Sequence, residues 1–406
     1  MIIKNYFLSL ALLLSGFAFS QTGTMVTGSL RSGGVTRTYQ IYVPLKYQTL
    51  NVPVPVVFNV HGLTGTYTSQ DVAEDFRKIA DTANFLIVLP QGLSSSSSGF
   101  PSTGWDVWNS VASGQADRDF IIHLLDKVET NYKVDINRVY TAGFSQGAYM
   151  SYNLGCLNSN RFAAVSSTSG SMVQAYINAC SPVHPIPVIE IHGTNDALVS
   201  YTGNANATAT DSIVKFWVNY NHCNPTPVAT KLADIADSAT VDTSTVIHYV
   251  YSGGTKGATV EFFKVLNGGH NIPAMAPVPA EYGLGHINQD FTAAKEIWRF
   301  FSKYRLDSLG TTAILGNFVD AINSPEANNT GVSVYPNPST GTFTVNVDTY
   351  DNTSLQVLNL LGTVVYEGKL SNNRTTIDLT GVAKGIYFYK VADKNAVVKS
   401  GKLVIE

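Results

Sequence analysis

Residues 143–147, Gly-Phe-Ser-Gln-Gly, constrain this chain more than any other segment. They follow the apolar run 139–142 and precede residues 148–154, which favour a helix. A G-x-S-x-G sequence between a strand and a helix is typical of a sharp turn with a strained serine backbone. The flanking glycines make room for that turn because they carry no Cβ atom. We therefore expect the Ser145 hydroxyl to be exposed beside a helix N-terminus, where negative charge is favoured.

The region around this turn alternates between apolar runs and segments with helical spacing. The sequence predicts strands at residues 39–43, 54–60, 85–89, 139–142, 163–165, 188–191, 246–251 and 259–266, and helices at 72–83, 120–128, 212–220 and 290–304. Near-continuous apolar strands separated by amphipathic helices indicate an α/β fold, with a mostly parallel sheet and helices on both faces. Functional side chains in such sheets gather at the carboxyl ends of the strands.

The pattern changes after residue 304. Residues 306–330 show no regular periodicity and are predicted to form a linker. From residue 331 to 406, short strand signals are separated by turn residues, which predicts a small C-terminal β-sandwich. The main domain is accordingly expected at residues 21–305.

The first 20 residues have the features of a secretory signal peptide. Lys4 precedes an apolar stretch at residues 6–19, and small residues flank a cleavage position before Gln21. No later stretch is long and apolar enough to predict a membrane span. Only 14% of the residues are charged and the net charge is −3, so binding to nucleic acid is not expected.

Three cysteines in an exported chain favour one disulfide and one spare thiol. Cys156 ends the helix after the serine turn and Cys180 precedes the next core strand, which favours a Cys156–Cys180 bond, although spacing alone cannot exclude a pairing with Cys223. The cysteines are scattered and no histidine pair has ligand spacing, so no metal site or other cofactor is predicted.

A serine nucleophile needs a base, and the base needs a carboxylate to orient it. Asp196 follows the expected strand 188–191, and His270 follows Asn-Gly-Gly at the end of the strand 259–266. Their order, serine then acid then histidine, is the one that accompanies G-x-S-x-G. Alternative readings are that Asp196 only closes a turn, or that His286 is the base.

Two backbone N–H groups should stabilise the oxyanion, which is the negatively charged oxygen that forms when a serine attacks a carbonyl group. We expect them at Gln146, which follows the nucleophile, and at Leu63, in the loop after the strand 54–60. Trp105 and Trp108 lie in a loop where exposed indoles could stack on a substrate ring, unless both simply cap the core.

Four segments in order, residues 60–63, 143–148, 191–196 and 268–273, resemble the secreted esterase family that includes polyhydroxybutyrate depolymerase-like enzymes and feruloyl and acetyl-xylan esterases. The resemblance covers about residues 36–304. It implies an α/β-hydrolase fold with Ser145, Asp196 and His270 as the catalytic triad. The family often has Trp after the catalytic histidine where this chain has Ile272, which leaves acyl specificity open.

The C-terminal segment resembles the type IX secretion sorting domain of Bacteroidetes, through residues 334–339, Val-Tyr-Pro-Asn-Pro-Ser, and residues 385–387, Gly-Ile-Tyr. This resemblance implies export across the outer membrane, to the cell surface or the medium, with the secretion machinery as a partner. A carbohydrate-binding sandwich is the alternative.

Together these features predict a secreted serine esterase that works through an acyl-enzyme. Its expected substrates are feruloyl or acetyl esters of plant polysaccharide, and a polyhydroxyalkanoate depolymerase is the close alternative. A serine peptidase on the same fold and a non-catalytic glycan-binding protein are more distant alternatives.

Overall fold

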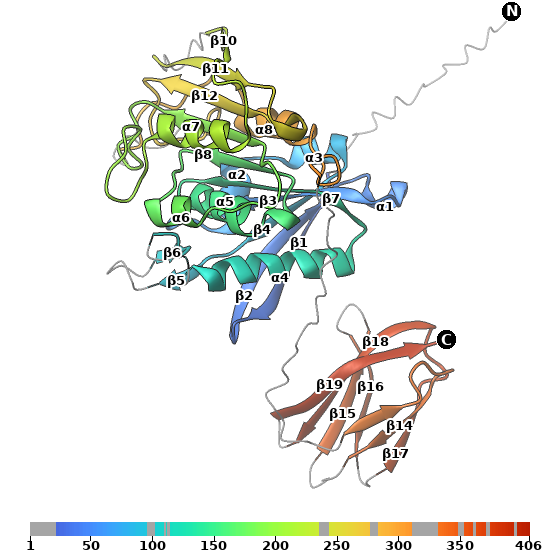
Figure 1. The fold of residues 1–406 in the computed structure, drawn as a ribbon. Helices are drawn as coiled ribbons and strands as arrows, with labels where there is room; N and C mark the ends of the chain where they lie inside the picture. The colour runs from blue at the N-terminus through green and yellow to red at the C-terminus, as the bar shows by residue number, and fades with distance from the viewer. Residues whose placement is uncertain are drawn as a thin grey trace, which may run out of the picture. The chain divides into compact units, whose positions relative to one another are not determined.

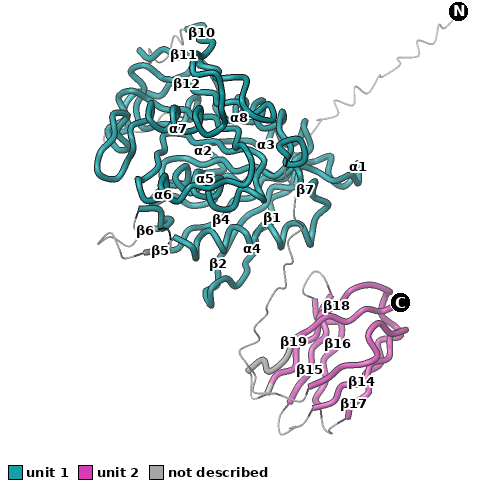
Figure 2. Tube along the Cα trace, viewed as in Figure 1, with its two compact units in different colours: residues 1–318 teal, residues 319–406 magenta. Residues whose placement is uncertain are grey.

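The computed structural model describes residues 22–95, 102–108, 111, 114–234, 243–276, 283–310, 332–347, 353–359, 363–370, 374–393 and 396–406. The predicted signal peptide and most of the predicted linker lie outside these residues. The chain forms two compact units, residues 1–318 and 319–406 (Figure 2). Each unit is described by itself below.

Unit 1 is built on a ten-stranded sheet with the order β1-β2-β4-β3-β7-β8-β9-β12-β11-β10 (Figure 1). The strands are β1 (Thr24–Ser32), β2 (Val35–Val43), β3 (Val54–Val60), β4 (Leu86–Pro90), β7 (Val134–Phe144), β8 (Ala164–Thr168), β9 (Val188–Gly193), β10 (Val228–Lys231), β11 (Thr245–Tyr251) and β12 (Val260–Leu266). Parallel pairing runs without interruption from β4 to β12, and antiparallel strands complete both edges. A further hairpin pairs β5 (Leu93–Ser95) with β6 (Ser102–Gly104).

Helices cover both faces of this sheet (Figure 1). They are α1 (Tyr47–Leu50), α2 (Tyr67–Ala73), α3 (Arg77–Ala83), α4 (Gln115–Asn131), α5 (Gln146–Leu157), α6 (Gln174–Ala179), α7 (Thr210–Tyr220) and α8 (Ala293–Phe301). Side chains of α3 and α8 share one buried core with the sheet, and side chains of α4, α5 and α7 pack in cores with the sheet as well. This arrangement is the α/β architecture that the alternating sequence pattern predicts.

The helix predicted at residues 72–83 is wrong in one respect, because the structure divides it into α2 and α3. Glu74 ends α2 with non-helical backbone angles, φ −122° and ψ 72°. The Asp75 carboxylate then accepts hydrogen bonds from the backbone N–H and the side chain of Arg77, which begins α3. A carboxylate that binds nearby N–H groups favours a helix start over helix continuation.

Unit 2 consists of two small antiparallel sheets. One has the order β13-β14-β17 and the other the order β16-β15-β18-β19. Their strands are β13 (Ser333–Tyr335), β14 (Thr342–Asn346), β15 (Thr353–Leu358), β16 (Val364–Lys369), β17 (Arg374–Asp378), β18 (Gly385–Asp393) and β19 (Ala396–Ile405). Buried side chains from both sheets, such as Phe343, Leu355 and Leu403, form a single core, as a sandwich requires.

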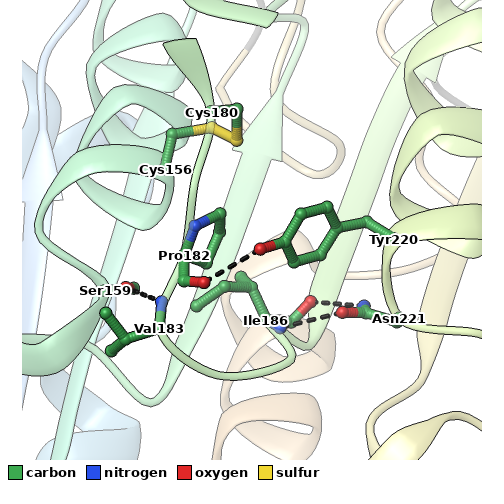
Figure 3. The surroundings of a disulfide bond; sticks show 8 residues. All are labelled: Cys156, Ser159, Cys180, Pro182, Val183, Ile186, Tyr220 and Asn221. Atoms are coloured by element: carbon green, nitrogen blue, oxygen red, sulfur yellow. Dashed lines mark hydrogen bonds between the residues drawn. A yellow bond between two sulfur atoms is a disulfide. The ribbon is translucent and has the colours of Figure 1, made fainter.

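The predicted disulfide between Cys156 and Cys180 is present and joins the end of α5 to the segment after α6 (Figure 3). That segment is also held by hydrogen bonds from Val183 N–H to Ser159 and from Tyr220 to the Pro182 carbonyl. The remaining cysteine, Cys223, is a buried free thiol.

The first residues of the predicted linker belong to unit 1. Leu306 and Leu309 are buried in the core that contains α8, and the Leu306 N–H donates to the Asn137 carbonyl at 2.9 Å. Among the described residues, none of the helices combines the length and apolarity that a bilayer crossing needs.

Candidate active site

Ser145 occupies a strained turn between β7 and α5. Its backbone angles are φ 54° and ψ −122°, which is outside the regions that side chains normally allow. A Cβ at Gly143 would lie 2.3 Å from the Gly147 carbonyl carbon, and a Cβ at Gly147 would lie 2.0 Å from the Val60 carbonyl oxygen. Both glycines are therefore required, because the turn packs backbone directly against backbone.

The structure brings the three predicted catalytic residues together. The Ser145 Oγ lies 2.9 Å from His270 Nε2, and His270 Nδ1 lies 2.7 Å from Asp196 Oδ2. Ser145 follows β7, Asp196 follows β9 and His270 follows β12, so all three stand at the carboxyl ends of parallel strands. His270 is 125 residues from Ser145 and 74 residues from Asp196 along the sequence.

The loop that carries His270 is fixed by backbone contacts with residues 284–286. The Gly269 N–H donates to the His286 carbonyl at 2.9 Å, and the His270 N–H donates to the Leu284 carbonyl at 2.7 Å. The Asn271 side chain donates to the same stretch. His286, the alternative base, thus supports His270 through its backbone.

Asp196 is positioned to act as an ionised acceptor. Its Oδ1 accepts the N–H groups of Leu198 and Val199 at 2.9 and 2.8 Å. Burial alone would raise the pKa of Asp196, but hydrogen bonds from His192 and His270 hold this pKa well below its usual range. An ionised carboxylate only accepts, so His270 Nδ1 carries the proton and Nε2 is free to accept from the serine hydroxyl.

The two predicted oxyanion donors border Ser145. Gly62 is packed against the serine, since a Cβ at Gly62 would lie 3.1 Å from Ser145 Cβ. Leu63 follows it, and no hydrogen bond of the Leu63 N–H is present within the described parts of the chain. Gln146 is the first residue of α5, so its N–H has no partner inside the helix.

His61 braces this loop as a neutral side chain. Its Nε2 accepts the Gly92 N–H at 2.9 Å, which requires an unprotonated nitrogen, and its Nδ1 donates to the Gly62 carbonyl at 2.7 Å. Burial lowers the pKa of His61 to about 4, which keeps the ring neutral at physiological pH.

The two tryptophans predicted to bind substrate differ in burial. Trp105 is 3% exposed; its indole N–H donates to the His61 carbonyl at 2.8 Å, and its backbone N–H donates to Gln146 Oε1 at 2.9 Å. Trp105 therefore links, from the buried side, the two segments that carry the predicted oxyanion donors. Trp108 is 38% exposed and packs edge-on against Tyr149 of α5, with 6.2 Å between ring centroids.

Sequence reasoning assigned no role to Glu190 and His192, which lie behind Asp196. Both side chains are fully buried, and His192 Nε2 lies 3.4 Å from Asp196 Oδ2. One sequence signal could have linked them. Glu190 lies within the predicted strand 188–191 and His192 follows it directly, and residues two apart along a strand lie on the same face of a sheet. No group of three or more metal-ligating side chains is found in the described parts of the chain.

Two family models match the chain. Residues 55–223 match the Phospholipase/Carboxylesterase family, and residues 333–406 match the Secretion system C-terminal sorting domain. The predicted resemblance to α/β-hydrolase esterases and to a sorting domain is thus confirmed.

Curated relatives agree with these matches. Over 287 residues the chain is 24% identical to a bifunctional acetylxylan esterase/xylanase of Neocallimastix patriciarum, covering 71% of this chain and 36% of that protein. It is 31% identical over 178 residues to feruloyl esterase C of Emericella nidulans, covering 43% of this chain and 57% of that protein. It is 25% identical over 246 residues to poly(3-hydroxyalkanoate) depolymerase C of Paucimonas lemoignei, covering 54% and 55%. The chain therefore spans about a third to three fifths of the length of these relatives.

Proposed function

We propose that unit 1 is a serine esterase that hydrolyses carboxylic esters through an acyl-enzyme. The observation that carries this proposal is the continuous hydrogen-bonded chain from Ser145 through His270 to Asp196. The resemblance to carboxylesterases gives the reaction class.

In the proposed reaction, Ser145 Oγ attacks the ester carbonyl carbon while His270 Nε2 takes the hydroxyl proton. The Asp196 carboxylate stabilises the imidazolium that results. The N–H groups of Leu63 and Gln146 bind the tetrahedral oxyanion, and loss of one such donor typically costs about 3 kcal/mol of barrier. His270 returns its proton to the departing alkoxide. A water molecule, deprotonated by His270, then attacks the acyl carbonyl and releases the acid.

The proposed substrates are feruloyl or acetyl esters of plant polysaccharide. Acetylxylan and feruloyl esterases among the relatives support this choice, and the half-exposed Trp108 could stack on an aromatic acyl ring. The relative named as a polyhydroxyalkanoate depolymerase supports polyester as the second candidate. Ile272 is only 1% exposed, so the side chain at this position packs in the core of unit 1.

A substrate panel on the full-length protein tests this proposal. Methyl ferulate, acetylated xylan and polyhydroxybutyrate film would be compared for wild type, Ser145→Ala and Ser212→Ala, a control in which an exposed serine at the start of α7 is replaced. We expect Ser145→Ala to lower kcat on the order of 10⁶-fold and Ser212→Ala to leave it unchanged. Equal rates for Ser145→Ala and wild type would refute the nucleophile, and turnover of peptide amides without esters would refute the esterase.

We further propose that unit 2 directs the chain to the outer-membrane secretion machinery, with residues 1–20 as the export signal. The sorting-domain match over residues 333–406 supports this assignment. Deletion of residues 331–406 should leave active enzyme in the periplasm of a secreting host. Normal release of the shortened chain into the medium would contradict the proposal.

A further inference from the structure

Asp196 is one end of a buried polar chain that continues away from the catalytic serine. Behind it, His192 Nε2 lies 2.9 Å from the Val199 carbonyl oxygen and 3.4 Å from Asp196 Oδ2. The other ring nitrogen, Nδ1, lies 3.0 Å from Glu190 Oε1. Glu190 and His192 have no exposed side-chain surface, so water does not screen these contacts.

The partners of His192 restrict where its protons can be. The Val199 carbonyl only accepts hydrogen bonds, so Nε2 carries a proton. An ionised Glu190 also only accepts, so Nδ1 must then carry a second proton and the ring is an imidazolium. The alternative is a neutral ring whose Nδ1 accepts from a protonated Glu190. The Tyr152 hydroxyl donates to Glu190 Oε2 at 2.6 Å, which favours the ionised carboxylate.

The surroundings favour the imidazolium. Burial alone would lower the pKa of His192, but hydrogen bonds with Asp196 and Glu190 and the charges of both carboxylates outweigh it and raise the pKa to about 10. Burial and the charge of Glu190 raise the pKa of Tyr152 well above its usual value, so the phenol of α5 stays neutral.

Among the described residues, neighbouring elements bring no further charged group into contact with His192. On the loop side, the Tyr201 ring meets the imidazole edge-on at 5.9 Å and donates its hydroxyl to Asp211. On the adjacent strand β12, the Lys264 ammonium lies 4.8 Å from the Tyr201 ring centroid and 3.8 Å from Asp211.

We propose that Glu190 and His192 form a buried ion pair that positions the triad: His192 holds the Asp196 carboxylate, and its positive charge opposes a second positive charge in the triad. This inference rests on the proposed function, because it assigns a role within the same triad. Both imidazoles contact the same oxygen atom, Asp196 Oδ2: His192 Nε2 lies 3.4 Å from it and His270 Nδ1 lies 2.7 Å from it. Two imidazolium rings that contact the same carboxylate oxygen would repel each other, so a charged His192 disfavours a second positive charge in the triad.

Glu190→Gln removes the charges of both partners while it keeps their hydrogen bonds, and the charge of His192 is the one in contact with Asp196. A glutamine amide can donate to His192 Nδ1 and accept from the Tyr152 hydroxyl, so each contact is kept while the ring becomes neutral. We expect the acidic limb of the pH–rate profile for kcat/KM to move to higher pH, because the repulsion by the His192 imidazolium is then removed. A role limited to packing would lower the rate equally at every pH.

Glu261→Gln is the matched control. Glu261 is another buried glutamate that contacts a histidine, His248, at 2.9 Å, but within the described residues its other partners are Arg299 and Lys303 and it does not contact the triad. The acidic limb of the pH–rate profile of Glu261→Gln should coincide with that of wild type. A limb that stays in place in a folded Glu190→Gln variant, or that moves equally in both variants, overturns the proposal.

Two readouts remain informative if esters are not hydrolysed or if Glu190→Gln does not fold. The rate at which a fluorophosphonate labels Ser145 needs only the nucleophile and its base, so a shifted pH profile without ester turnover would refute the proposed function and support this inference. In wild type and Glu261→Gln labelled with ¹⁵N-histidine, we expect one imidazolium that keeps both ring protons at pH 8. Its absence from both spectra would overturn the ion pair.

Discussion

Glu74 gives a quantitative test of the electrostatics inside unit 1. It lies at the end of α2 and is 1% exposed. Within the part of the chain that the structure describes, only neutral groups donate to its carboxyl: Gln70 Nε2 at 3.1 Å and the Thr168 hydroxyl at 3.4 Å. Burial raises the pKa of Glu74 from 4.5 to about 7, and the two hydrogen bonds lower it only in part.

The sign of the effect follows from this raised pKa. The folded protein favours the protonated acid, so the stabilising contribution is fully present below about pH 4.5 and is lost as the pH rises towards 7. The 2.5-unit difference between 7 and 4.5 corresponds to about 3 kcal/mol. Glu74→Gln keeps a neutral side chain of the same shape, so the free energy of unfolding of this variant relative to wild type should rise by about 3 kcal/mol between pH 4 and pH 8.

Urea denaturation followed by tryptophan fluorescence measures this difference, because Trp105, Trp108, Trp217 and Trp298 all lie in unit 1. Glu261→Gln is the control with the opposite sign. Burial would raise the pKa of Glu261, but hydrogen bonds from His248, Arg299 and Lys303 lower it, so its contribution is lost as the pH falls. Parallel pH profiles for wild type and Glu74→Gln would show that Glu74 is not a buried neutral acid.

Three further variants, one of them a double substitution, test other parts of the structure. Gly147→Ala places a Cβ 2.0 Å from the Val60 carbonyl oxygen and should cost about 1–3 kcal/mol of stability together with most of the esterase activity; a thermal melt and a p-nitrophenyl acetate assay would check both. Replacing Cys156 and Cys180 with alanine opens a loop with a sequence separation of 24 and should cost about 3 kcal/mol in urea denaturation. Trp108→Ala should raise KM for methyl ferulate several-fold while KM for p-nitrophenyl acetate stays within twofold, and an equal rise for both esters would exclude stacking on the acyl ring.

The central strands and the triad could be predicted from the sequence because their signals are local. A continuous apolar run, such as residues 54–60, is sufficient to indicate a buried parallel strand. Each triad member directly follows such a run, as Asp196 and His270 do, and the topology of the sheet then places them at one edge.

Other features depend on contacts that no local pattern records. The exposed edge strand β10 carries no apolar run, and the break between α2 and α3 depends on the Asp75 carboxylate. The burial of Trp105 follows from its bond to the His61 carbonyl, 44 residues away. The role of His192 required knowing which groups face both ring nitrogens.

The position of Trp105 has a consequence for engineering. Through its indole N–H and its backbone N–H, Trp105 joins the loop that follows β6 to both segments that are proposed to bind the oxyanion. Exchange of this loop with that of another esterase would therefore disturb the turnover step along with the choice of substrate. Libraries that aim at new acyl groups should hold Trp105 constant and vary exposed positions such as Trp108 and Leu198.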